Sequence, residues 1–324
     1  MSEKTKKIII TSVTALVLLG LVVVGTIFDL EISRALAIKT DGYFTTDTFT
    51  MFFESFGENI LYLLVGCALA IIVWYLRKVE NKKLRLFLQT LFSVVGLGIW
   101  FFCTHRTIGY LGEHLGELGE THMSKTYVTL IKLFSALTLN TLTIFCFKNL
   151  SEETINNLFK WALVVLIAAA VSNGVVQGLK MFWGRYRYRA MNVEGVFDSY
   201  SPWYIIHGKR NITETQALLG IATDAYKSFP SGHTCAATSI FLLTVLPAVF
   251  DKLNNKKAKI VLWGISSVYT AVVALSRIMC GAHFFTDVLI SFIITLVVIL
   301  VVKWLIINNG YKKFIKHKNK EANN

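Results

Sequence analysis

Long apolar stretches alternate with polar segments along this sequence. About 20 apolar residues cross a hydrocarbon core about 30 Å thick, and about 17 can suffice. Eight stretches of this size occur along the chain, at residues 8–28, 60–76, 86–103, 127–147, 161–178, 234–250, 260–276 and 284–307. The fourth is the weakest, because it contains Lys132 and a polar stretch around Asn140. The pattern predicts an all-α, polytopic membrane bundle of about eight transmembrane helices.

Composition also favours a membrane protein. Hydrophobic residues make up 54% of the chain, and the mean hydropathy of +0.55 is far above what a soluble domain needs to fill its core. The first apolar stretch follows Lys4, Lys6 and Lys7, as in a signal peptide. It is long and lacks a small-residue cleavage site before Asp29, so we expect a retained membrane anchor.

The distribution of charge predicts the orientation of the chain. The net charge is +13, and most basic residues cluster in alternate loops. These basic segments are the N-terminus, 77–85, 148–160, 251–259 and the tail from Lys303. Eight spans place all five on one side, and basic loops mark the cytoplasm, so both termini are predicted to be cytoplasmic. The charge therefore serves orientation, and we expect no nucleic-acid partner.

The loops between these basic segments are expected to face the exterior. Loops 29–59 and 104–126 are richer in acidic residues and glycine. The external loop 181–233 departs from this pattern, because it carries six further basic residues: Arg185, Arg187, Arg189, Lys209, Arg210 and Lys227. Since these charges oppose the topology bias, they indicate an anion-binding role.

Three polar segments occur where apolar stretches meet the predicted outer surface. They are KMFWGRYRYR at 180–189, SFPSGH at 228–233 and SRIMCGAHFFTD at 276–287. Ionisable groups at such positions are commonly functional. Because all three segments fall on the same predicted face, we expect them to form one site.

The side chains of these segments suit a phosphate dianion. Lys180, Arg187 and Arg277 supply positive charge, and Arg185 is a further candidate. Ser231 and the backbone amide of Gly232 add neutral donors at a helix N-terminus, where aligned N–H groups favour anions.

The same segments supply a nucleophile and an acid. His283 and Asp287 are four residues apart, so on a helix they share one face, and the carboxylate can orient one ring nitrogen while the other attacks phosphorus. His233 can protonate the leaving oxygen. This chemistry needs no metal, and neither a metal nor another cofactor is predicted. A group of histidines and glutamates in loop 104–126 matches no standard ligand spacing and is expected to be a polar loop: His105, His114, His122, Glu113, Glu117 and Glu120.

These segments resemble the signature of the type 2 phosphatidic acid phosphatase superfamily. That signature is Lys, six residues, Arg-Pro; then Pro-Ser-Gly-His; then Ser-Arg, five residues, His, three residues, Asp. Lys180 and Arg187 match the first motif, although Tyr188 stands where the family usually has proline. The other two motifs match fully, at Pro230, Ser231, Gly232 and His233 and at Ser276, Arg277, His283 and Asp287.

The resemblance implies a phosphatase core of six helices in which His283 is the nucleophile, Asp287 orients it and His233 is the acid. The remaining matched groups would bind phosphate. Three spans precede the first motif in the family core, whereas five are predicted here. We therefore expect N-terminal helices and loops at 1–157, a catalytic core at 158–308 that includes the external loop, and a basic cytoplasmic tail at 309–324.

The expected function is that of a membrane lipid phosphatase, which hydrolyses a phosphomonoester or diphosphate of a lipid through a phosphohistidine at the external face. The resemblance implies phosphatidic acid, phosphatidylglycerol phosphate and a polyprenyl diphosphate such as undecaprenyl diphosphate as candidate substrates, and does not choose among them. Besides the substrate, membrane lipids are the expected partners. Abundant Lys, Asn and Ile suit a bacterial plasma membrane.

Other functions remain open. A lipid phosphotransferase and a vanadate-dependent haloperoxidase share this type of site, although the second fits poorly with so apolar a chain. A non-catalytic lipid-phosphate binder or a transporter would need the cations. Neither would need an oriented histidine together with a second, proton-donating one, so the complete histidine motifs favour an enzyme.

Overall fold

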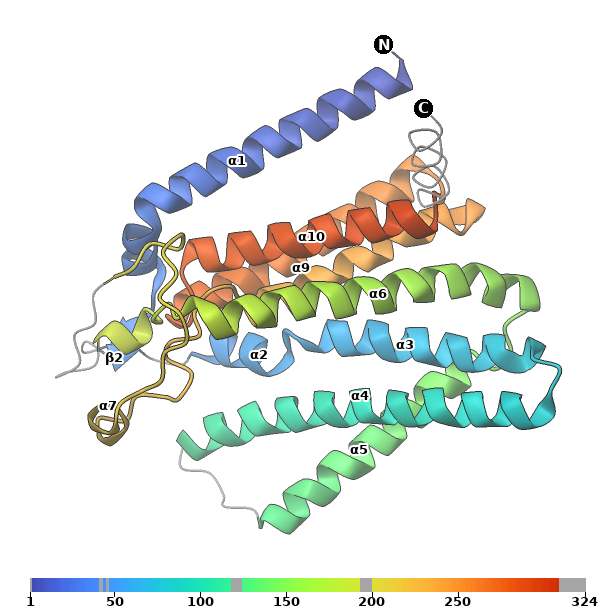
Figure 1. Ribbon diagram of the computed structural model, residues 1–324, viewed down its shortest axis with the longest axis horizontal. Helices are drawn as coiled ribbons and strands as arrows, with labels where there is room; N and C mark the ends of the chain where they lie inside the picture. Colours follow the sequence, from blue (N-terminus) through green and yellow to red (C-terminus); the bar gives the residue numbers. More distant parts are fainter. Residues whose placement is uncertain (1, 41–42, 45–46, 118–123, 193–199, 309–324) are drawn as a thin grey trace, which may run out of the picture. The chain divides into compact units, whose positions relative to one another are not determined.

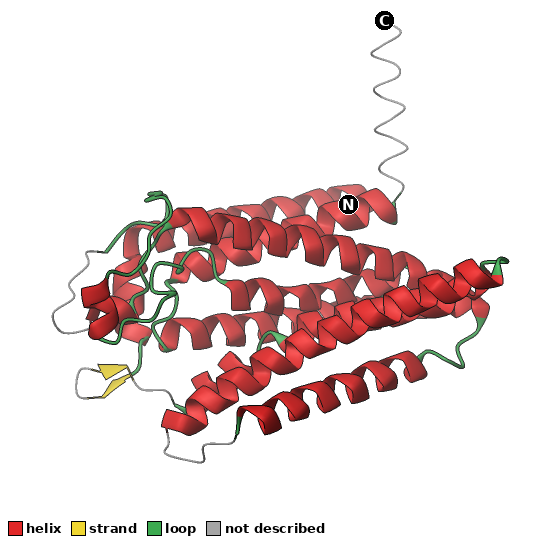
Figure 2. Cartoon of the chain, turned by 60° about the horizontal axis from the view of Figure 1, so that its bottom comes forward, coloured by secondary structure: helices red, strands yellow, loops and turns green. Residues whose placement is uncertain are grey.

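Helices dominate the computed structural model, which describes residues 2–40, 43–44, 47–117, 124–192 and 200–308 (Figures 1 and 2). The α-helices are α1 Glu3–Leu36, α2 Thr48–Phe56, α3 Asn59–Tyr75, α4 Lys82–Glu117, α5 Lys125–Cys146, α6 Glu152–Trp183, α7 Glu214–Leu218, α8 Gly232–Thr238, α9 Lys256–Met279 and α10 Phe285–Ile306. Short 3₁₀ helices lie at η1 Leu76–Lys78, η2 Arg189–Asn192, η3 Ser239–Ala248 and η4 Asp251–Leu253. Within these described ranges the strands are confined to one antiparallel pair, β1 Lys39–Thr40 and β2 Tyr43–Phe44. The all-α prediction is confirmed.

The long apolar stretches of the sequence all lie on helices. In the part of the chain that the structure describes, seven helical segments are long and apolar enough to cross a membrane: Ile8–Leu36, Thr48–Lys78, Lys82–His114, Lys125–Cys146, Glu152–Trp183, Lys256–Met279 and Phe285–Ile306. The chain is therefore an integral membrane protein. Several segments named in the sequence analysis lie outside the described residues: the predicted basic tail 309–324, residues 193–199 of the loop predicted to be external, and Glu120 and His122.

The remaining predicted span is a shorter apolar segment, Gly232–Ala248. It begins as the seven-residue α8 and continues as the ten-residue 3₁₀ helix η3, which contains Pro247. A 3₁₀ helix rises about 2.0 Å per residue, compared with about 1.5 Å in an α-helix. The whole segment therefore extends about 30 Å, the thickness of a hydrocarbon core, although it has fewer residues than the other spans.

The chain divides into two compact units. The first contains residues 1–50, 175–232 and 274–293, and the second contains residues 51–174, 233–273 and 294–324. The first unit holds most of the residues that the sequence nominates for the site. The second holds most of the apolar helical packing and His233.

In the second unit α3, α4 and α5 pack against one another (Figure 1). Buried side chains of these helices form one cluster with a residue each of α6 and α8: Leu61, Tyr62, Trp100, Cys103, Ala136, Ala169 and Ala236. Gly66 of α3 allows this close packing, because a Cβ there would lie 2.8 Å from Nε1 of Trp100. The missing side chain of Gly66 thus lets the Trp100 ring approach the backbone of α3 closely.

We expect Gly66→Ala to destabilise the protein by about 1–3 kcal/mol, because the added methyl group would push the Trp100 ring out of its packed position. Gly98→Ala in α4 is the matched control, since a Cβ at Gly98 meets nothing within 4 Å and should only gain about 0.5–1 kcal/mol of helix propensity. The measurement is the midpoint of thermal unfolding of each purified variant in detergent. Equal midpoints for the two variants would contradict this account of the α3–α4 contact.

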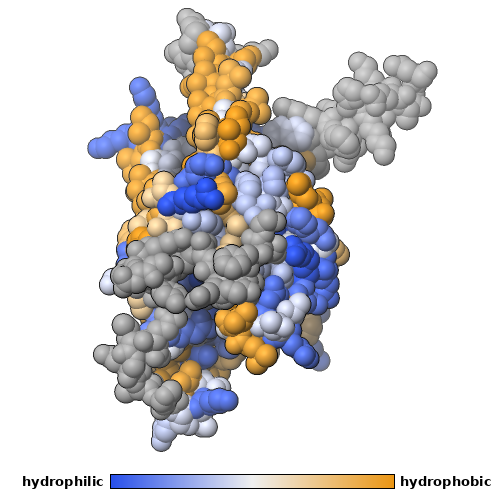
Figure 3. Space-filling model, turned by 90° about the vertical axis from the view of Figure 1, so that its left-hand side faces the viewer, coloured by the Kyte–Doolittle hydropathy of each residue, from blue (hydrophilic) through white to orange (hydrophobic). Residues whose placement is uncertain are grey.

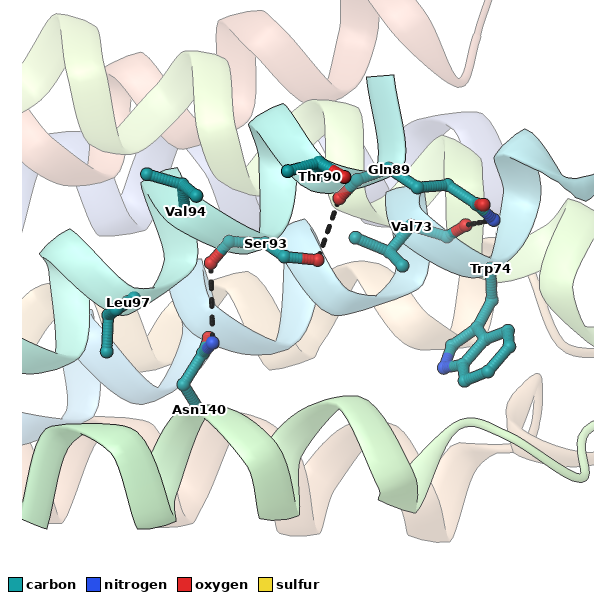
Figure 4. Close-up of a pocket in the computed structure, with 8 residues that line it drawn as sticks. All are labelled: Val73, Trp74, Gln89, Thr90, Ser93, Val94, Leu97 and Asn140. Carbon is teal, nitrogen blue, oxygen red and sulfur yellow. Dashed lines mark hydrogen bonds between the residues drawn. The ribbon is translucent and has the colours of Figure 1, made fainter. Parts of the chain in front are cut away.

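Polar side chains bridge the same three helices. A pocket of about 380 Å³ is lined by residues of α3, α4 and α5 (Figure 4). Gln89 Nε2 donates to the carbonyl oxygen of Val73 at 2.9 Å, and Asn140 Nδ2 donates to that of Ser93 at 3.3 Å. Because both amides find acceptors on neighbouring helices, Asn140, part of the polar stretch that weakened the prediction of α5, is accommodated within the packing.

In the first unit α1 is apolar along most of its length. Its side chains between Ile8 and Phe28 are largely exposed, and they form the hydrophobic surface at the top of Figure 3. The helix bends at Phe28, whose backbone angles are non-helical (φ −113°, ψ 17°), and continues to Leu36. Near this bend Gly25 packs against Phe285 and Thr286 of α10. The face away from these contacts is suited to lipid.

Candidate active site

The first sequence motif continues from α6 into a non-helical segment that joins the other two motifs. The Arg189 amide donates to the carbonyl oxygen of Gly281 at 2.8 Å, which ties the segment to the loop between α9 and α10. The Ser228 amide donates to the carbonyl oxygen of Arg185 at 3.1 Å, which ties it to the loop before α8. The turn out of α6 requires glycine, because Gly184 has φ +69° and a Cβ there would collide with the Gly208 carbonyl oxygen.

His283 lies in the short loop between α9 and α10. Its ring atom Nδ1 is 2.6 Å from the carbonyl oxygen of Ser228, and the ring is almost completely buried. A carbonyl oxygen can only accept a hydrogen bond, so Nδ1 carries the proton and the lone pair of a neutral ring is on Nε2. Ser228 thus fixes the tautomer that a nucleophilic imidazole requires.

Asp287 is linked to His283 mainly through neighbouring groups and less by direct contact. Its Oδ2 accepts from Ser228 Oγ at 2.5 Å and from the Phe284 amide at 2.8 Å, whereas His283 Nδ1 is 3.7 Å away. The sequence suggested a pair on one helix face, but α10 begins at Phe285, so His283 precedes the helix. Asp287 is the third residue of α10, where a carboxylate can cap the helix start through the Phe284 amide. It holds the histidine chiefly through Ser228.

The environment of His283 keeps the ring neutral. Burial lowers its pKa, the positive charges of Lys180 and Arg187 lower it further, and the nearby Asp287 only partly opposes them, so that the pKa falls to about 3. The ring is thus uncharged at physiological pH. An uncharged ring with its lone pair on Nε2 can form a bond to phosphorus.

The cations predicted to bind phosphate occupy different surroundings in the first unit. Lys180 Nζ lies beside Gly232, where a Cβ would be 3.7 Å away from it. Arg187 Nη2 pairs with Asp224 Oδ2 at 2.7 Å. Burial alone would raise the pKa of the Asp224 carboxyl, but Arg187, Arg189 and Lys180 outweigh it and lower that pKa. Asp224 was not nominated from the sequence.

The other predicted phosphate donors lie close to the backbone of neighbouring elements. Arg277 is buried, and its Nη2 donates to the Thr50 carbonyl oxygen at 3.2 Å. The Ser231 amide donates to the carbonyl oxygen of Asp287 at 3.0 Å, and Ser291 Oγ donates to that of Ser231 at 2.6 Å. These bonds fix the start of α8 against the first turns of α10.

Arg185, the further candidate, lies completely buried between two carboxylates. Its Nη1 contacts Asp287 Oδ1 at 2.5 Å and its Nη2 contacts Asp29 Oδ2 at 2.7 Å. Its Nε donates to the Ser201 carbonyl oxygen at 2.9 Å. Burial alone would lower the pKa of Arg185, but Asp287 and Asp29 outweigh it and raise that pKa, so the guanidinium stays charged. The guanidinium donates to Asp29, Asp287 and the Ser201 carbonyl oxygen, so Arg185 helps to hold the Asp287 carboxylate in place.

His233 is the second residue of α8 and belongs to the second unit. Its Nε2 is 3.1 Å from the Glu54 carbonyl oxygen, and its Nδ1 is 3.3 Å from Glu58 Oε1. Both groups are acceptors, so both contacts are hydrogen bonds only if both ring nitrogens carry protons. Arg106 forms a bidentate pair with Glu58, at 2.6 and 3.0 Å, and donates to the Tyr110 hydroxyl at 2.6 Å. The carboxylate of Glu58, next to Nδ1, thus favours the protonated, positively charged form of the His233 ring.

Three of these acidic residues could have been suspected from the sequence. Asp29, Glu54 and Glu58 lie in or beside apolar stretches, where a buried carboxylate needs a partner. The apolar pattern placed them in an external loop, because nothing in it indicated that α1 continues past Asp29 or that α2 forms before α3.

Metal ligation is a separate question. Across the described residues, no three or more His, Cys, Asp or Glu side chains are grouped so that they could hold a metal ion. His114, one of the histidines of the 104–126 segment, is instead buried in α4 with its Nε2 3.4 Å from Glu54 Oε2.

A comparison with known families concerns the region that contains these residues. A family model described as the PAP2 superfamily matches residues 161–311. This region is a PAP2 superfamily domain. The PAP2 domain contains all three motifs and every site residue nominated from the sequence, whereas α1 to α5 precede it. No curated protein and no solved structure matches the chain.

Proposed function

We propose that this PAP2 superfamily membrane protein is a lipid phosphatase that works through a phosphohistidine on His283. The observation that carries the proposal is the buried, neutral imidazole of His283, with Nδ1 fixed by the Ser228 carbonyl oxygen and the lone pair on Nε2. Lys180 and Arg187, whose charges reach this ring, would hold the phosphate.

The reaction has two steps. In the first, Nε2 of His283 forms a bond to phosphorus, the bond from phosphorus to the lipid oxygen breaks, and His233 gives a proton to the departing oxygen. In the second, His233 takes a proton from water, whose oxygen attacks phosphorus, and phosphate leaves His283. The roles follow the motifs, and the paired acceptors at both nitrogens of His233 support a protonated ring before the first step.

A lipid substrate is supported by apolar side chains beside the motifs. Tyr204, Ile205 and Ile206 of the external loop are exposed, and such residues favour the interface between lipid headgroups and hydrocarbon. The phosphate of a lipid lies in that plane. Phosphatidic acid, phosphatidylglycerol phosphate and polyprenyl diphosphate remain the candidate substrates.

The decisive experiment measures inorganic phosphate release by the purified protein in detergent with EDTA present. The panel contains phosphatidic acid, phosphatidylglycerol phosphate and undecaprenyl diphosphate, with glycerol phosphate as a soluble comparison. We expect release from at least one lipid. Binding of these lipids without release of phosphate would instead favour a binder or transporter, and transfer of phosphate to an added lipid alcohol faster than to water would favour a phosphotransferase.

We also propose that the chain crosses the membrane eight times with both termini cytoplasmic and the motifs outside. The bond from the Arg189 amide to the Gly281 carbonyl oxygen supports it, because it brings the chain after α6 and after α9 to one side. The 24 residues of α9 extend about 36 Å, so its start lies on the other side. The apolar segment Gly232–Ala248 is then the crossing between them.

A reporter fused after Lys257 should therefore read cytoplasmic. A fusion after Lys209, in the external loop, is the control and should read external. If the Lys257 fusion also reads external, Gly232–Ala248 does not cross and the eight-span arrangement fails.

The lowered pKa of His283 predicts an unusual pH dependence. A histidine with its ordinary pKa, about 6.5, would lose nucleophilicity about tenfold per unit as the pH falls below that value. With a pKa of about 3, the ring stays neutral throughout this range. We expect the rate of phosphoenzyme formation from an aryl phosphate, whose leaving group needs no proton, to change less than about twofold between pH 8 and pH 6. The measurement is rapid-quench labelling, and a fall of about fourfold over this range, the change that a pKa of about 6.5 gives, would show that His283 titrates normally.

A further inference from the structure

Asp29 is the residue that the proposed mechanism leaves unused and the packing does not explain. It is completely buried, yet it belongs to α1, whose residues between Ile8 and Phe28 are mostly apolar and largely exposed. It also precedes the PAP2 domain by more than a hundred residues of sequence. A buried carboxylate on such a helix is costly unless it is paired, so its partners indicate its role.

Two residues of the catalytic segments, Arg185 and Thr286, donate three hydrogen bonds to the Asp29 carboxylate. Oδ2 accepts from Arg185 Nη2 at 2.7 Å and from Thr286 Oγ1 at 2.5 Å. Oδ1 accepts from the Thr286 amide at 2.9 Å. That amide is one of the first-turn donors of α10 that have no partner within their own helix. Asp29 therefore caps the helix that carries Asp287, and does so from a different helix.

The contacts continue from Asp29 to the nucleophile. Arg185 contacts Asp29 with one terminal nitrogen and Asp287 with the other. Asp287 accepts from Ser228 Oγ, and the Ser228 carbonyl oxygen accepts from His283 Nδ1. Phe284, beside His283, lies under the guanidinium, with Arg185 Cζ 4.1 Å from its ring centroid. Each of these bonds lies within the first unit.

We infer that Asp29 is a positioning residue of the phosphatase site, which fixes Arg185 and the start of α10 and thereby sets the orientation of Asp287, Ser228 and His283. The inference rests on the proposed function. The N-terminal helix α1 then contributes, through Asp29, to positioning the catalytic residues. Without the Asp29 charge, Arg185 would have Asp287 as its one carboxylate partner among these residues, and its position would relax toward that group.

The alternative is that Asp29 only anchors α1, and the two roles differ in what they change. Loss of an anchor lowers stability and the fraction of folded protein, but each folded molecule keeps its normal turnover. Loss of a positioning residue lowers kcat per active site and leaves KM nearly unchanged, because Asp29 does not touch phosphate. Supporting residues around catalytic groups typically contribute about 10- to 100-fold to activity.

The experiment uses the full-length protein in detergent with ³²P-labelled phosphatidic acid. The amount of base-stable, acid-labile label counts the sites that form phosphohistidine, and turnover is divided by that number. We expect Asp29→Asn to lower kcat per labelled site about 10- to 100-fold with KM within about twofold of the wild type.

Two controls on α1 separate the roles. Glu31→Gln removes an exposed carboxylate two residues away. Thr26→Val removes the hydrogen bond from Trp203 Nε1, a 2.9 Å contact of α1 that does not involve Arg185. Both should keep the wild-type kcat per labelled site, even if Thr26→Val unfolds at a lower temperature.

Each outcome decides the inference. Wild-type kcat per labelled site in Asp29→Asn, with fewer sites or a lower unfolding temperature, would make Asp29 an anchor only. If Asp29→Asn does not fold, Asp29→Glu keeps the charge but displaces it by one methylene, and it should lower kcat per site about tenfold; a normal value overturns the inference. A wild-type protein that neither releases phosphate nor takes up label on any lipid of the panel overturns the proposed function, and the inference with it.

Discussion

His283→Asn should lower kcat for lipid phosphate release by about 10⁴-fold or more and abolish labelling of the protein. Loss of the nucleophile removes the covalent pathway, and in enzymes whose catalytic residues act as a unit such losses reach about 10⁶-fold. Asparagine can keep a donor toward the Ser228 carbonyl oxygen, the contact that Nδ1 makes at 2.6 Å, so the fold around the site should survive. The measurements are phosphate release and ³²P incorporation from labelled phosphatidic acid.

The matched control is His105→Asn, which changes an exposed histidine of α4. It should leave both readouts at wild-type levels. If His283→Asn still incorporates acid-labile label, another residue is the nucleophile. Labelling lost without any effect on phosphate release would mean that water attacks phosphorus directly.

His233→Asn should separate the two steps of the reaction. Without the acid, kcat for a lipid monophosphate should fall about 10²- to 10⁴-fold, because an alkoxide is a poor leaving group. For an aryl phosphate, formation of the phosphoenzyme should fall less than about tenfold. Its hydrolysis should still be slow, because His233 is also the proposed base. Label should therefore accumulate in this variant with an aryl substrate, as a burst in rapid-quench experiments.

The contacts of His233 provide a second check on its role. Glu58 lies 3.3 Å from Nδ1, so Glu58→Gln should weaken the preference for a protonated ring. Its effect should therefore be larger for a lipid monophosphate than for an aryl phosphate, in the same sense as His233→Asn. Equal losses for the two substrates in both variants would contradict the assignment of His233 as the acid.

The apolar pattern predicted the helices well because membrane spans depend mainly on length and hydropathy. It predicted even α5, in which Asn140 finds an acceptor on α4. The pattern could not predict the internal form of Gly232–Ala248, since hydropathy does not distinguish a 3₁₀ from an α-helix. It also placed Asp29 in a loop, because the apolar stretch ends at Phe28, whereas the helix bends there and continues.

The motifs identified the residues that can do the chemistry but not how they are held. The spacing of His283 and Asp287 suggested direct contact on a helix, yet the nearer partner of the ring is the carbonyl oxygen of Ser228. A backbone acceptor carries no signature in the sequence. Asp29 is equally hidden, because its contact with Arg185 joins residues 156 positions apart.

The backbone bonds around the first motif have a consequence for position 188. The amides that tie this segment to its neighbours belong to Arg187, which donates to the Ala225 carbonyl oxygen at 2.8 Å, and to Arg189. These two amides belong to the residues on either side of Tyr188. Both bonds can therefore form whether position 188 holds the usual proline or this tyrosine. The tyrosine adds an edge-to-face contact with Phe284, the neighbour of His283, at 5.9 Å between ring centroids. Proline at position 188 would restrict the backbone. In this chain Tyr188 instead restrains the segment by packing its ring against Phe284 of the catalytic loop.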